Sequence, residues 1–390
     1  MGVSGVVNAG HLGTDLASYR PIWPCTGTTF VNRAQRGAMT SPAQLGSSLR
    51  VNASMTRNTD LKIAVLLSFV LLALPLLIDS RYIIGQVILA MFYAIIATQW
   101  NLLFGFAGIF SLAQMAIFAL GGYVTAMLAS YLAWPMLMAI VAAALGTAAI
   151  SVLIGLACLR LAGVYVSLLT LAIAQAMYVL IVSDTECFTM VGNQCRQFTG
   201  GAVGFARFGD LGMRELLGRH WIWGNYAIVV ALFALCSGFT YFIIHSPMGL
   251  AFKALRDNPG YAVARGVNRF QSQLLVFAFS AFFTGLAGGI YAAHFQAIGP
   301  GVLSMSQFLF IIAIAVVGGT GNFWGPIVGT LVLMSADELM REMGEFRTLG
   351  LGLIITASVV WMPQGLLGRL QDLQQWWRRT RSLQNATKPS

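Results

Sequence analysis

Charged residues are scarce in this chain. Asp, Glu, Lys and Arg make up 9% of its 390 residues, whereas 57% of the residues are hydrophobic and the mean hydropathy is +0.76. Soluble domains carry about 25% charged residues, so this chain lacks the side chains that would cover a water-facing surface. The composition excludes a disordered chain and a disulfide-stapled secreted domain, and it indicates a protein that uses lipid as its solvent.

The chain also contains long segments without any Asp, Glu, Lys or Arg. Four such segments are 82–159, 220–252, 270–336 and 348–368. Carriers coupled to protons or ions, and voltage sensors, usually keep ionisable groups inside the membrane. Two histidines near these segments, His245 and His294, lie at span ends. A carrier driven by an ion gradient is therefore disfavoured, and uphill transport would need a different source of energy.

A nucleotide-binding motif is missing as well. A P-loop requires a lysine followed by Ser or Thr after a glycine-rich turn, and none of the three lysines, Lys62, Lys253 and Lys388, has that setting. The sequence lacks the clustered histidines of a zinc site and the nucleophile–base pair of an enzyme. We therefore expect a non-enzymatic chain without a cofactor or metal of its own, with ATP and Mg²⁺ bound to separate ATPase subunits.

Long apolar runs are what the sequence does contain. A helix needs about 20 mostly apolar residues to cross the hydrocarbon core of a membrane. Ten runs approach that length: 62–79, 82–104, 106–130, 135–159, 161–183, 223–244, 272–295, 306–320, 325–340 and 347–363. Alternating strands are missing, so helices must satisfy the backbone in lipid. The sequence predicts an all-α polytopic membrane helix bundle of about ten transmembrane spans, with glycine-broken helices near 105–125 and 306–340.

The placement of Lys and Arg predicts the orientation of the bundle. The loop 245–272 carries Lys253, Arg256, Arg265 and Arg269 against a single carboxylate. Basic loops stay on the cytoplasmic side, so both termini are expected in the cytoplasm and the loop 184–222 outside. The net charge of +10 then reflects topology and contact with anionic membrane lipid rather than a nucleic-acid surface.

Three parts follow from this map. Residues 1–60 are rich in Gly, Ser, Thr and Asn and are predicted to form a disordered N-terminal extension, of which we expect 1–54 to be dispensable. Residues 61–368 form the transmembrane domain. Residues 369–390 form a basic cytoplasmic tail, with the apolar and basic spacing of a helix that lies on the membrane surface.

The longest cytoplasmic loop, 247–268, is the best candidate for docking an ATPase. A short helix is predicted over 249–257 and a second one over 261–265, and an Asn-Pro-Gly turn separates them. A short helix that presents Phe252 and Leu255 between charges suits a groove in a partner. A solvated basic loop that only sets the orientation remains the alternative from this stretch alone.

This loop resembles a G-x-A-x-x-A-x-R-x-N stretch of LivM-type permeases, the membrane subunits of branched-chain amino acid ABC importers. Three more stretches are similar to the same family: Gly105–Ala113, Thr199–Gly204 and Gly318–Pro326. The four stretches occur in the family's order over residues 82–370. The resemblance implies a permease subunit of the bacterial inner membrane that pairs with a second homologous permease, two cytoplasmic ATPase subunits and a periplasmic substrate-binding protein.

The resemblance also implies a set of ATPase-coupling residues. The positions that match the family's coupling loop are Gly249, Phe252, Lys253, Ala254, Arg256, Asp257, Asn258, Ala262 and Gly266. The chain departs from the family at Ala113-Gln114, where Gly-His is common, and at Gln175, where Glu is common. Both departures fall on the presumed path, so they bear on which substrate is carried.

Polar side chains inside an uncharged bundle cost energy unless they are paired. Those that remain in the first half are candidates to line the translocation path: Gln99, Asn101, Ser111, Gln114, Tyr165, Thr170 and Gln175. Broken helices expose backbone dipoles that can meet a zwitterion. For each single residue the alternative stays open, namely a hydrogen bond between helices that contributes about 0.6 kcal/mol.

Glycines and cysteines supply two further expectations. Gly285-x-x-x-Gly289 and Gly325-x-x-x-Gly329 predict close helix packing. The loop 184–222 contains Cys187 and Cys195, and an oxidising compartment permits a disulfide between them. Spacing alone leaves two free thiols equally open.

These features predict a membrane-spanning subunit of an ATP-driven importer, most consistent with branched-chain or related small amino acids. Its function would be conformational rather than catalytic. One alternative is an ATP-independent channel or facilitator for a small neutral solute. Another is an importer of the same type that acts on urea, amides or aromatic acids, because the binding protein would set the specificity.

Overall fold

The computed structural model describes residues 70–74 and 80–369, apart from residues 159, 160, 162, 192, 193, 219, 220, 345 and 362–364. The chain divides into two compact units, Met1–Ile63 and Ala64–Ser390, and the first lies outside the described residues. The predicted extension over 1–60, most of the first predicted span and nearly all of the tail over 369–390 also lie outside them. These predictions therefore stay untested.

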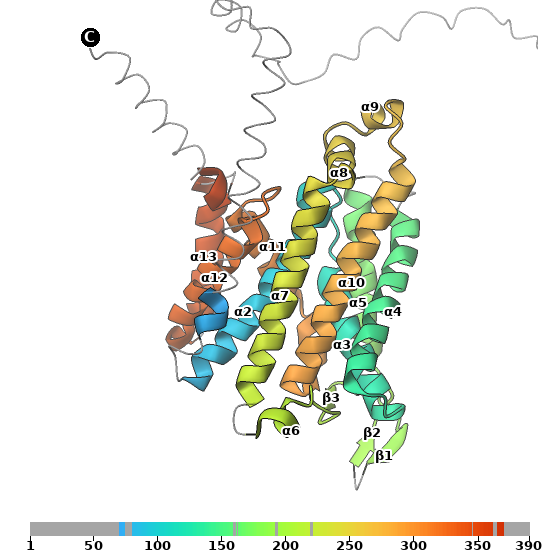
Figure 1. The fold of residues 1–390 in the computed structure, drawn as a ribbon, viewed down its shortest axis with the longest axis vertical. Coiled ribbons are helices and arrows are strands. Elements are labelled where there is room, and N and C mark those ends of the chain that lie inside the picture. The colour runs from blue at the N-terminus through green and yellow to red at the C-terminus, as the bar shows by residue number, and fades with distance from the viewer. Residues whose placement is uncertain are drawn as a thin grey trace, which may run out of the picture. The chain divides into compact units, whose positions relative to one another are not determined.

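Within the described residues, six helices are long and apolar enough to cross a membrane, and they run side by side in one bundle (Figure 1). They are α2 (Arg81–Asn101, continued by the π-helix η1, Leu102–Phe106), α3 (Gln114–Tyr131), α4 (Met136–Cys158), α5 (Val164–Val182), α7 (Trp221–His245) and α10 (Arg269–Phe295). This arrangement confirms the predicted all-α polytopic membrane fold.

Shorter elements complete the chain. The helices are α6 (Met213–Leu217), α8 (Pro247–Asp257), α9 (Pro259–Ala264), α11 (Met305–Gly318), α12 (Gly325–Leu339) and α13 (Phe346–Trp361), with 3-10 turns η3 (Pro300–Leu303) and η4 (Arg341–Met343). The strands β1 (Thr189–Val191) and β2 (Gln194–Arg196) form one antiparallel pair, and β3 (Phe205–Ala206) and β4 (Ala297–Ile298) form another. The sequence had not indicated these four strands, which are two or three residues long.

The predicted count of ten spans is not confirmed. The predicted spans 306–320 and 325–340 correspond to α11 and α12, which have 14 and 15 residues. At 1.5 Å per residue each helix is about 21–23 Å long, which is short of the ~30 Å hydrocarbon core. The two helices form a hairpin, since Gly329 approaches Ile314 while Gly325 approaches Gly318.

The third predicted span, 106–130, begins too early. α2 continues through η1 to Phe106, and a turn over 107–113 follows before α3 begins at Gln114. Gly108 in this turn has a φ of +72°, a conformation that residues with a β-carbon rarely adopt. The turn is almost as apolar as its flanking helices, so hydropathy alone does not separate it from them.

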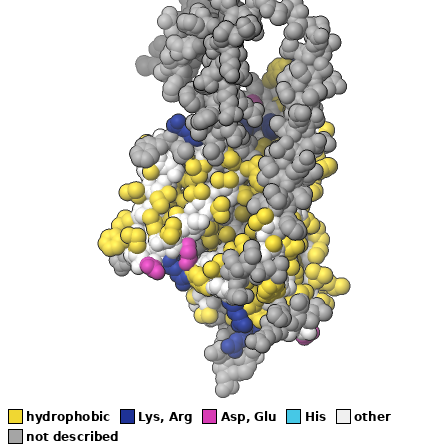
Figure 2. Space-filling model, turned by 60° about the vertical axis from the view of Figure 1, so that its left-hand side comes forward, with side chains coloured by type: hydrophobic (Ala, Val, Ile, Leu, Met, Phe, Trp, Pro, Cys, Tyr) yellow, Lys and Arg dark blue, Asp and Glu magenta, His cyan; other side chains and the backbone are white. Residues whose placement is uncertain are grey.

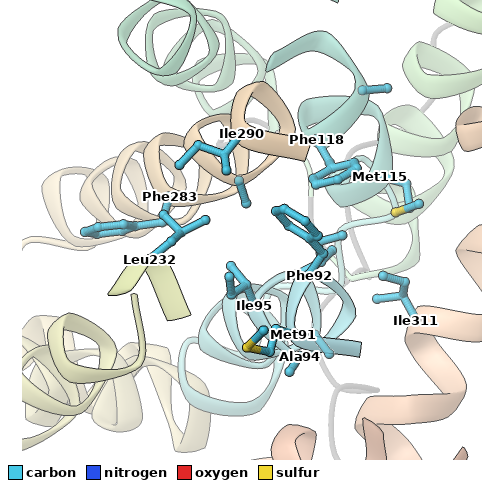
Figure 3. Close-up of a cluster of buried hydrophobic side chains, with 14 of the residues drawn as sticks. Met91, Phe92, Ala94, Ile95, Met115, Phe118, Leu232, Phe283, Ile290 and Ile311 are labelled. Atoms are coloured by element: carbon cyan, nitrogen blue, oxygen red, sulfur yellow. The ribbon is translucent and has the colours of Figure 1, made fainter. Parts of the chain in front are cut away.

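α2 lies at the centre of the bundle. In its most apolar window 72% of the residues are buried, against 33% in α4 and 28% in α5. Figure 3 shows Phe92 of α2 facing Phe118 of α3, with Phe283 and Ile290 of α10 nearby. The outer helices α4 and α5 instead leave many apolar side chains exposed. Figure 2 shows a broad hydrophobic belt on one flank, with charged side chains above and below it.

Both predicted glycine pairs pack helices closely, which confirms that prediction. A Cβ added to Gly289 of α10 would lie 2.7 Å from Oγ1 of Thr125 in α3. A Cβ on Gly329 of α12 would lie 3.0 Å from the backbone nitrogen of Gly318 in α11. Because neither position has room for a side chain, the backbones can approach each other directly.

The two large loops lie at opposite ends of the bundle, as the charge pattern indicates. Figure 1 shows α8 and α9 at one end, and α6 with β1–β2 at the other. At the β1–β2 end, Cys187 is disulfide-bonded. The side chain of Cys195 lies outside the described residues, so the Cys187–Cys195 pairing stays a prediction.

The segment Thr199–Gly204 ties the loop at the β1–β2 end to α10. The Asp184 carboxylate accepts hydrogen bonds from the backbone N–H and the hydroxyl of Thr199, both at 2.6 Å. A Cβ on Gly204 would lie 2.6 Å from Cα of Gly299, so only a glycine allows the loop to lie against the segment after α10. The antiparallel pairing of β3 with β4 then fixes the position of the loop along the segment that follows α10.

Candidate functional site

α2 loses its regular helical pattern where it approaches α8. Its last turn is the π-helix η1, after which the N–H of Ala107 donates to the carbonyl of Leu102 at 3.2 Å, and that of Ile109 to the carbonyl of Leu103 at 2.9 Å. Single π-turns frequently mark functional positions in α-helices. The break therefore singles out this end of α2 as a candidate site.

α8 lies directly on this π-helix. Phe252 is 2% exposed and belongs to the same buried cluster as Leu102 and Phe106. The Lys253 ammonium lies 5.3 Å from the centroid of the Phe106 ring, a cation–π contact that contributes about 0.5–1 kcal/mol at exposed sites.

The prediction that Phe252 and Leu255 face a partner is wrong. Both side chains are buried within this chain, at 2% and 7% exposure. An amphipathic helix buries its apolar face against the nearest apolar surface, and the buried cluster at η1 provides that surface. Phe252 belongs to that cluster and anchors α8 to its own bundle.

Arg256 extends from α8 to the break in α2. Its guanidinium donates a short hydrogen bond from Nη1 to the carbonyl oxygen of Gly105 in η1. The aliphatic part of the side chain lies against Gly108, where an added Cβ would be 2.7 Å from Cγ of Arg256. A second nitrogen, Nη2, lies 3.0 Å from the carboxylate of Asp257, a partly exposed ion pair.

Asn101 joins the same place to the turn between α11 and α12. Its amide oxygen accepts from the N–H of Gly321 at 2.9 Å, and its amide nitrogen donates to the carbonyl of Asn322 at 2.9 Å. We call Asn101, Gly105, Arg256 and Gly321 the glycine junction. It brings together three of the four family-like stretches that the sequence placed far apart.

The outward surface of α8 and α9 carries other apolar side chains. Leu250, Tyr261 and Val263 are 71%, 61% and 51% exposed. α9 begins at Asn258, whose side chain accepts from the N–H of Tyr261 at 3.0 Å. Gly266 after the helix has a φ of +88°. The predicted helix–turn–helix is therefore present, and its exposed apolar side chains are the ones that sequence reasoning missed.

Gly249 sets how closely α8 lies against α7. A Cβ at this position would meet the backbone of Ile243 and Ile244, 2.7 Å from the carbonyl carbon of Ile244. We expect Gly249→Ala to lower the free energy of unfolding by about 1–3 kcal/mol, the usual cost of overpacking, because α8 would have to move away from α7. Gly260→Ala is the matched control, since its Cβ would be 3.6 Å from the nearest atom. Thermal unfolding in detergent compares the two variants, and equal stability would contradict this role.

Several predicted path residues gather beside the break in α2, and they hydrogen-bond within the chain. Gln99 donates to the Thr240 hydroxyl at 3.0 Å, and Gln114 donates to the hydroxyls of Ser280 and Thr284. The Thr170 hydroxyl accepts from the N–H of Leu112 at 3.0 Å.

The remaining path residues differ in their surroundings. Ser111 is fully buried, and its carbonyl accepts from the indole N–H of Trp100 at 2.8 Å. Tyr165 is 68% exposed on α5, away from this group. Gln175 lies further along α5, and its amide nitrogen has no hydrogen-bond partner among the described residues. The assignment of all seven residues to a path stays a prediction.

The Gln114 contacts predict a measurable structural role. Gln114→Leu should lower the free energy of unfolding by about 0.6–1.7 kcal/mol, the usual range for a hydrogen bond between membrane helices. Thermal unfolding of the purified protein in detergent measures it. Gln86→Leu, at an exposed bond to Tyr82, should change stability less. An unchanged stability with an altered substrate preference would instead assign Gln114 to cargo contact.

Comparison with known proteins supports transport as the role of this arrangement. Residues 82–362 match the family described as "Branched-chain amino acid transport system / permease component". The high-affinity branched-chain amino acid transport permease protein LivM of Salmonella typhimurium is 28% identical over 302 residues, which cover 74% of this chain and 70% of LivM. LivM of Escherichia coli gives the same values.

A second type of permease is also similar. The high-affinity branched-chain amino acid transport permease protein LivH of Escherichia coli is 24% identical over 304 residues, which cover 71% of this chain and 91% of LivH. No solved structure matches the chain. The family match, together with the six helices of the described residues that are long and apolar enough to cross a membrane, identifies a multi-pass membrane protein that serves transport rather than catalysis. The chain belongs to the family of branched-chain amino acid transport system permease components.

Proposed function

We propose that this chain is the translocation subunit of an ATP-driven importer for branched-chain or related small amino acids in a bacterial inner membrane. It would pair with a second, homologous permease and receive its cargo from a periplasmic binding protein. Two cytoplasmic ATPase subunits would bind ATP and Mg²⁺. The names of its relatives, which are permeases of high-affinity branched-chain amino acid transport systems, support this substrate class.

One observation carries the proposal: α8 lies on the break in α2 and is bonded to it through Arg256. The short helices α8 and α9 expose Leu250, Tyr261 and Val263 at one end of the bundle, where a partner's groove can receive them. The same helices hold the π-helix in place. A force applied to α8 by a partner would therefore reach α2 directly.

The composition of the bundle supports an external source of energy. Long stretches of the membrane helices contain no Asp, Glu, Lys or Arg, and ion-coupled carriers usually depend on such groups. A conformational change driven by a partner needs only that the partner bind the two states of the permease with different affinity. The partner would contact α8, and the bond from α8 to Gly105 would make the position of α2 depend on that contact.

Reconstitution tests the proposed function. The chain is placed in vesicles with its sister permease, the two ATPases and the binding protein, and uptake of radiolabelled leucine is followed. We expect accumulation above the external concentration with ATP on the ATPase side and none without it. Leucine accumulation by the chain alone from a pH or sodium gradient would overturn the proposal, and equilibration without ATP would indicate the facilitator instead.

A further inference from the structure

A cavity of about 400 Å³ lies between α2, α3, α10 and the segment from η3 to α11. Its size falls within the ~300–1,000 Å³ range of small-molecule pockets in proteins. Its lining residues are Leu89, Phe92, Tyr93, Ile96, Met115, Phe118, Tyr291, Gly299, Gly301, Val302 and Gln307. None of the residues that the sequence proposed for the path is among them.

One wall of the cavity is aromatic. Phe92 and Phe118 each meet the ring of Tyr291 edge-on, with centroids 5.4 and 5.2 Å apart, and Figure 3 shows Met115 next to Phe118. These edge-to-face distances are favourable for aromatic pairs, so the three rings hold one another in place. They form a rigid apolar surface that suits an aliphatic side chain.

Another part of the lining is polar. The hydroxyl of Tyr93 donates to the amide oxygen of Gln307 at 2.5 Å, and this bond leaves the two N–H groups of the Gln307 amide for another acceptor. Gly299 and Gly301 add backbone groups without side chains in front of them. An apolar wall together with a few polar groups matches a small zwitterion with an aliphatic side chain, since pockets use such groups to fix orientation.

The position of the cavity fits a passage through the chain. Its Gly299 side lies against Gly204 of the loop at the β1–β2 end, opposite the end that carries α8. Toward α8, Met115 also lines a much smaller space, together with Trp100, Ser111 and Gln114.

The passage is closed beyond that space. Trp100, Phe104 and Phe110 pack ring against ring, with centroids 5.0–5.7 Å apart. Phe104 belongs to η1, the segment that Arg256 holds through Gly105. The cavity, the aromatic closure and the glycine junction thus follow one another along α2.

We propose that this cavity is the site where the permease holds its cargo, an amino acid with an aliphatic side chain. The side chain lies against Phe92, Phe118 and Tyr291, while Tyr93 and Gln307 orient the charged end. This inference rests on the proposed function and adds a location to it.

Photo-leucine, a leucine analogue that carries a diazirine, tests the site. The assembled complex in vesicles is illuminated with the probe, and modified peptides are identified by mass spectrometry. We expect labelling on the cavity-lining segments of α2, α3 and α10, and we expect excess leucine to suppress it. Labelling elsewhere in the chain, or labelling that leucine does not suppress, would overturn the site.

A filling variant gives a second readout. Val302→Trp should lower both photo-labelling and leucine uptake about tenfold, because the indole would occupy the space that the cargo needs. Val141→Trp, at a 46% exposed position on α4, is the matched control and should stay within about twofold of the original protein. Unchanged labelling and uptake in Val302→Trp would overturn the site.

The same assays separate this inference from the proposed function. If the original complex accumulates leucine but photo-leucine does not reach the cavity, only the location fails. If the complex does not accumulate leucine at all, the proposed function fails as well. If a photoactivatable fatty acid labels the cavity and photo-leucine does not, the cavity is a lipid site and the inference is overturned.

Discussion

In the importer proposed above, replacing Arg256 with alanine should lower leucine uptake about tenfold or more while the ATPase subunits continue to hydrolyse ATP. The guanidinium is the group on α8 that donates a hydrogen bond to the π-helix, through the carbonyl of Gly105. Without it, Phe252 and Lys253 would still contact η1, but the hydrogen bond that ties α8 to the backbone of α2 would be lost. The expected signature is therefore loss of coupling rather than loss of assembly.

The size of the effect follows from the chemistry of the bond. A hydrogen bond with a charged partner contributes about 1.5–3 kcal/mol, which corresponds to a factor of about 10–150 in an equilibrium. Asn101 bonds to Gly321 and Asn322 at the same place, but these bonds join α2 to the turn between α11 and α12 and not to α8, so they do not replace the Arg256 bond. We expect uptake to fall by about that factor or more.

Two further variants make the Arg256→Ala experiment specific. Arg256→Lys keeps the charge and should restore part of the uptake, although it loses the planar donor geometry. Arg269→Ala removes an exposed arginine whose bond within the described part of the chain runs along its own helix, to Gln273, and this variant should transport normally. Uptake by Arg256→Ala equal to that of the original complex would show that the glycine junction does not carry the coupling.

Most of the fold could be predicted from the sequence because hydrophobic length is a direct physical requirement of the membrane. Six predicted spans correspond to helices of the described residues that are long and apolar enough to cross a membrane. The errors fall where glycine rather than polarity ends a helix. The turn at Gly108 and the turn near Gly321 both have positive φ, and both are embedded in apolar sequence that hydropathy cannot divide.

The site was only half predictable for a different reason. The spacing of apolar and charged residues in α8 predicts a helix with two different faces. It does not indicate which of these faces packs against the rest of the chain. Phe252 packs inward because η1 offers it an apolar cluster, and the existence of η1 depends on a break in α2 that has no polar signal. The outward position of Leu250 follows from that packing, so it could be recognised only in three dimensions.

The buried polar residues and the lining of the cavity could likewise be predicted only in part from the sequence. Gln114 was found because a polar residue stands out in an apolar helix, yet its partners Ser280 and Thr284 lie 166 and 170 residues away along the chain. Phe92 and Tyr291, which line the cavity, are ordinary residues for a membrane helix. A cavity forms where several packed helices leave space between them. No short segment of the sequence indicates where this happens.

Gly288→Val should destabilise the protein more than Gln114→Leu does. A Cβ at Gly288 of α10 would lie 2.9 Å from the carbonyl carbon of Phe118 and 3.1 Å from the nitrogen of Gly122, both in the backbone of α3. Backbone atoms cannot rotate away, so α3 and α10 would have to separate. We expect a loss of about 2–3 kcal/mol in the free energy of unfolding, near the upper end for overpacking.

The control for this prediction is the same change on α4. Gly146→Val adds its side chain where nothing lies within 4 Å, and its stability should stay within about 0.5 kcal/mol of the original protein. Thermal unfolding in detergent compares the two variants. Separation of α3 from α10 would also move Phe118 away from Tyr291, whose rings now lie 5.2 Å apart. Gly288→Val should therefore lose photo-leucine labelling together with stability, whereas equal stability of the two variants would show that α3 and α10 do not depend on this close approach.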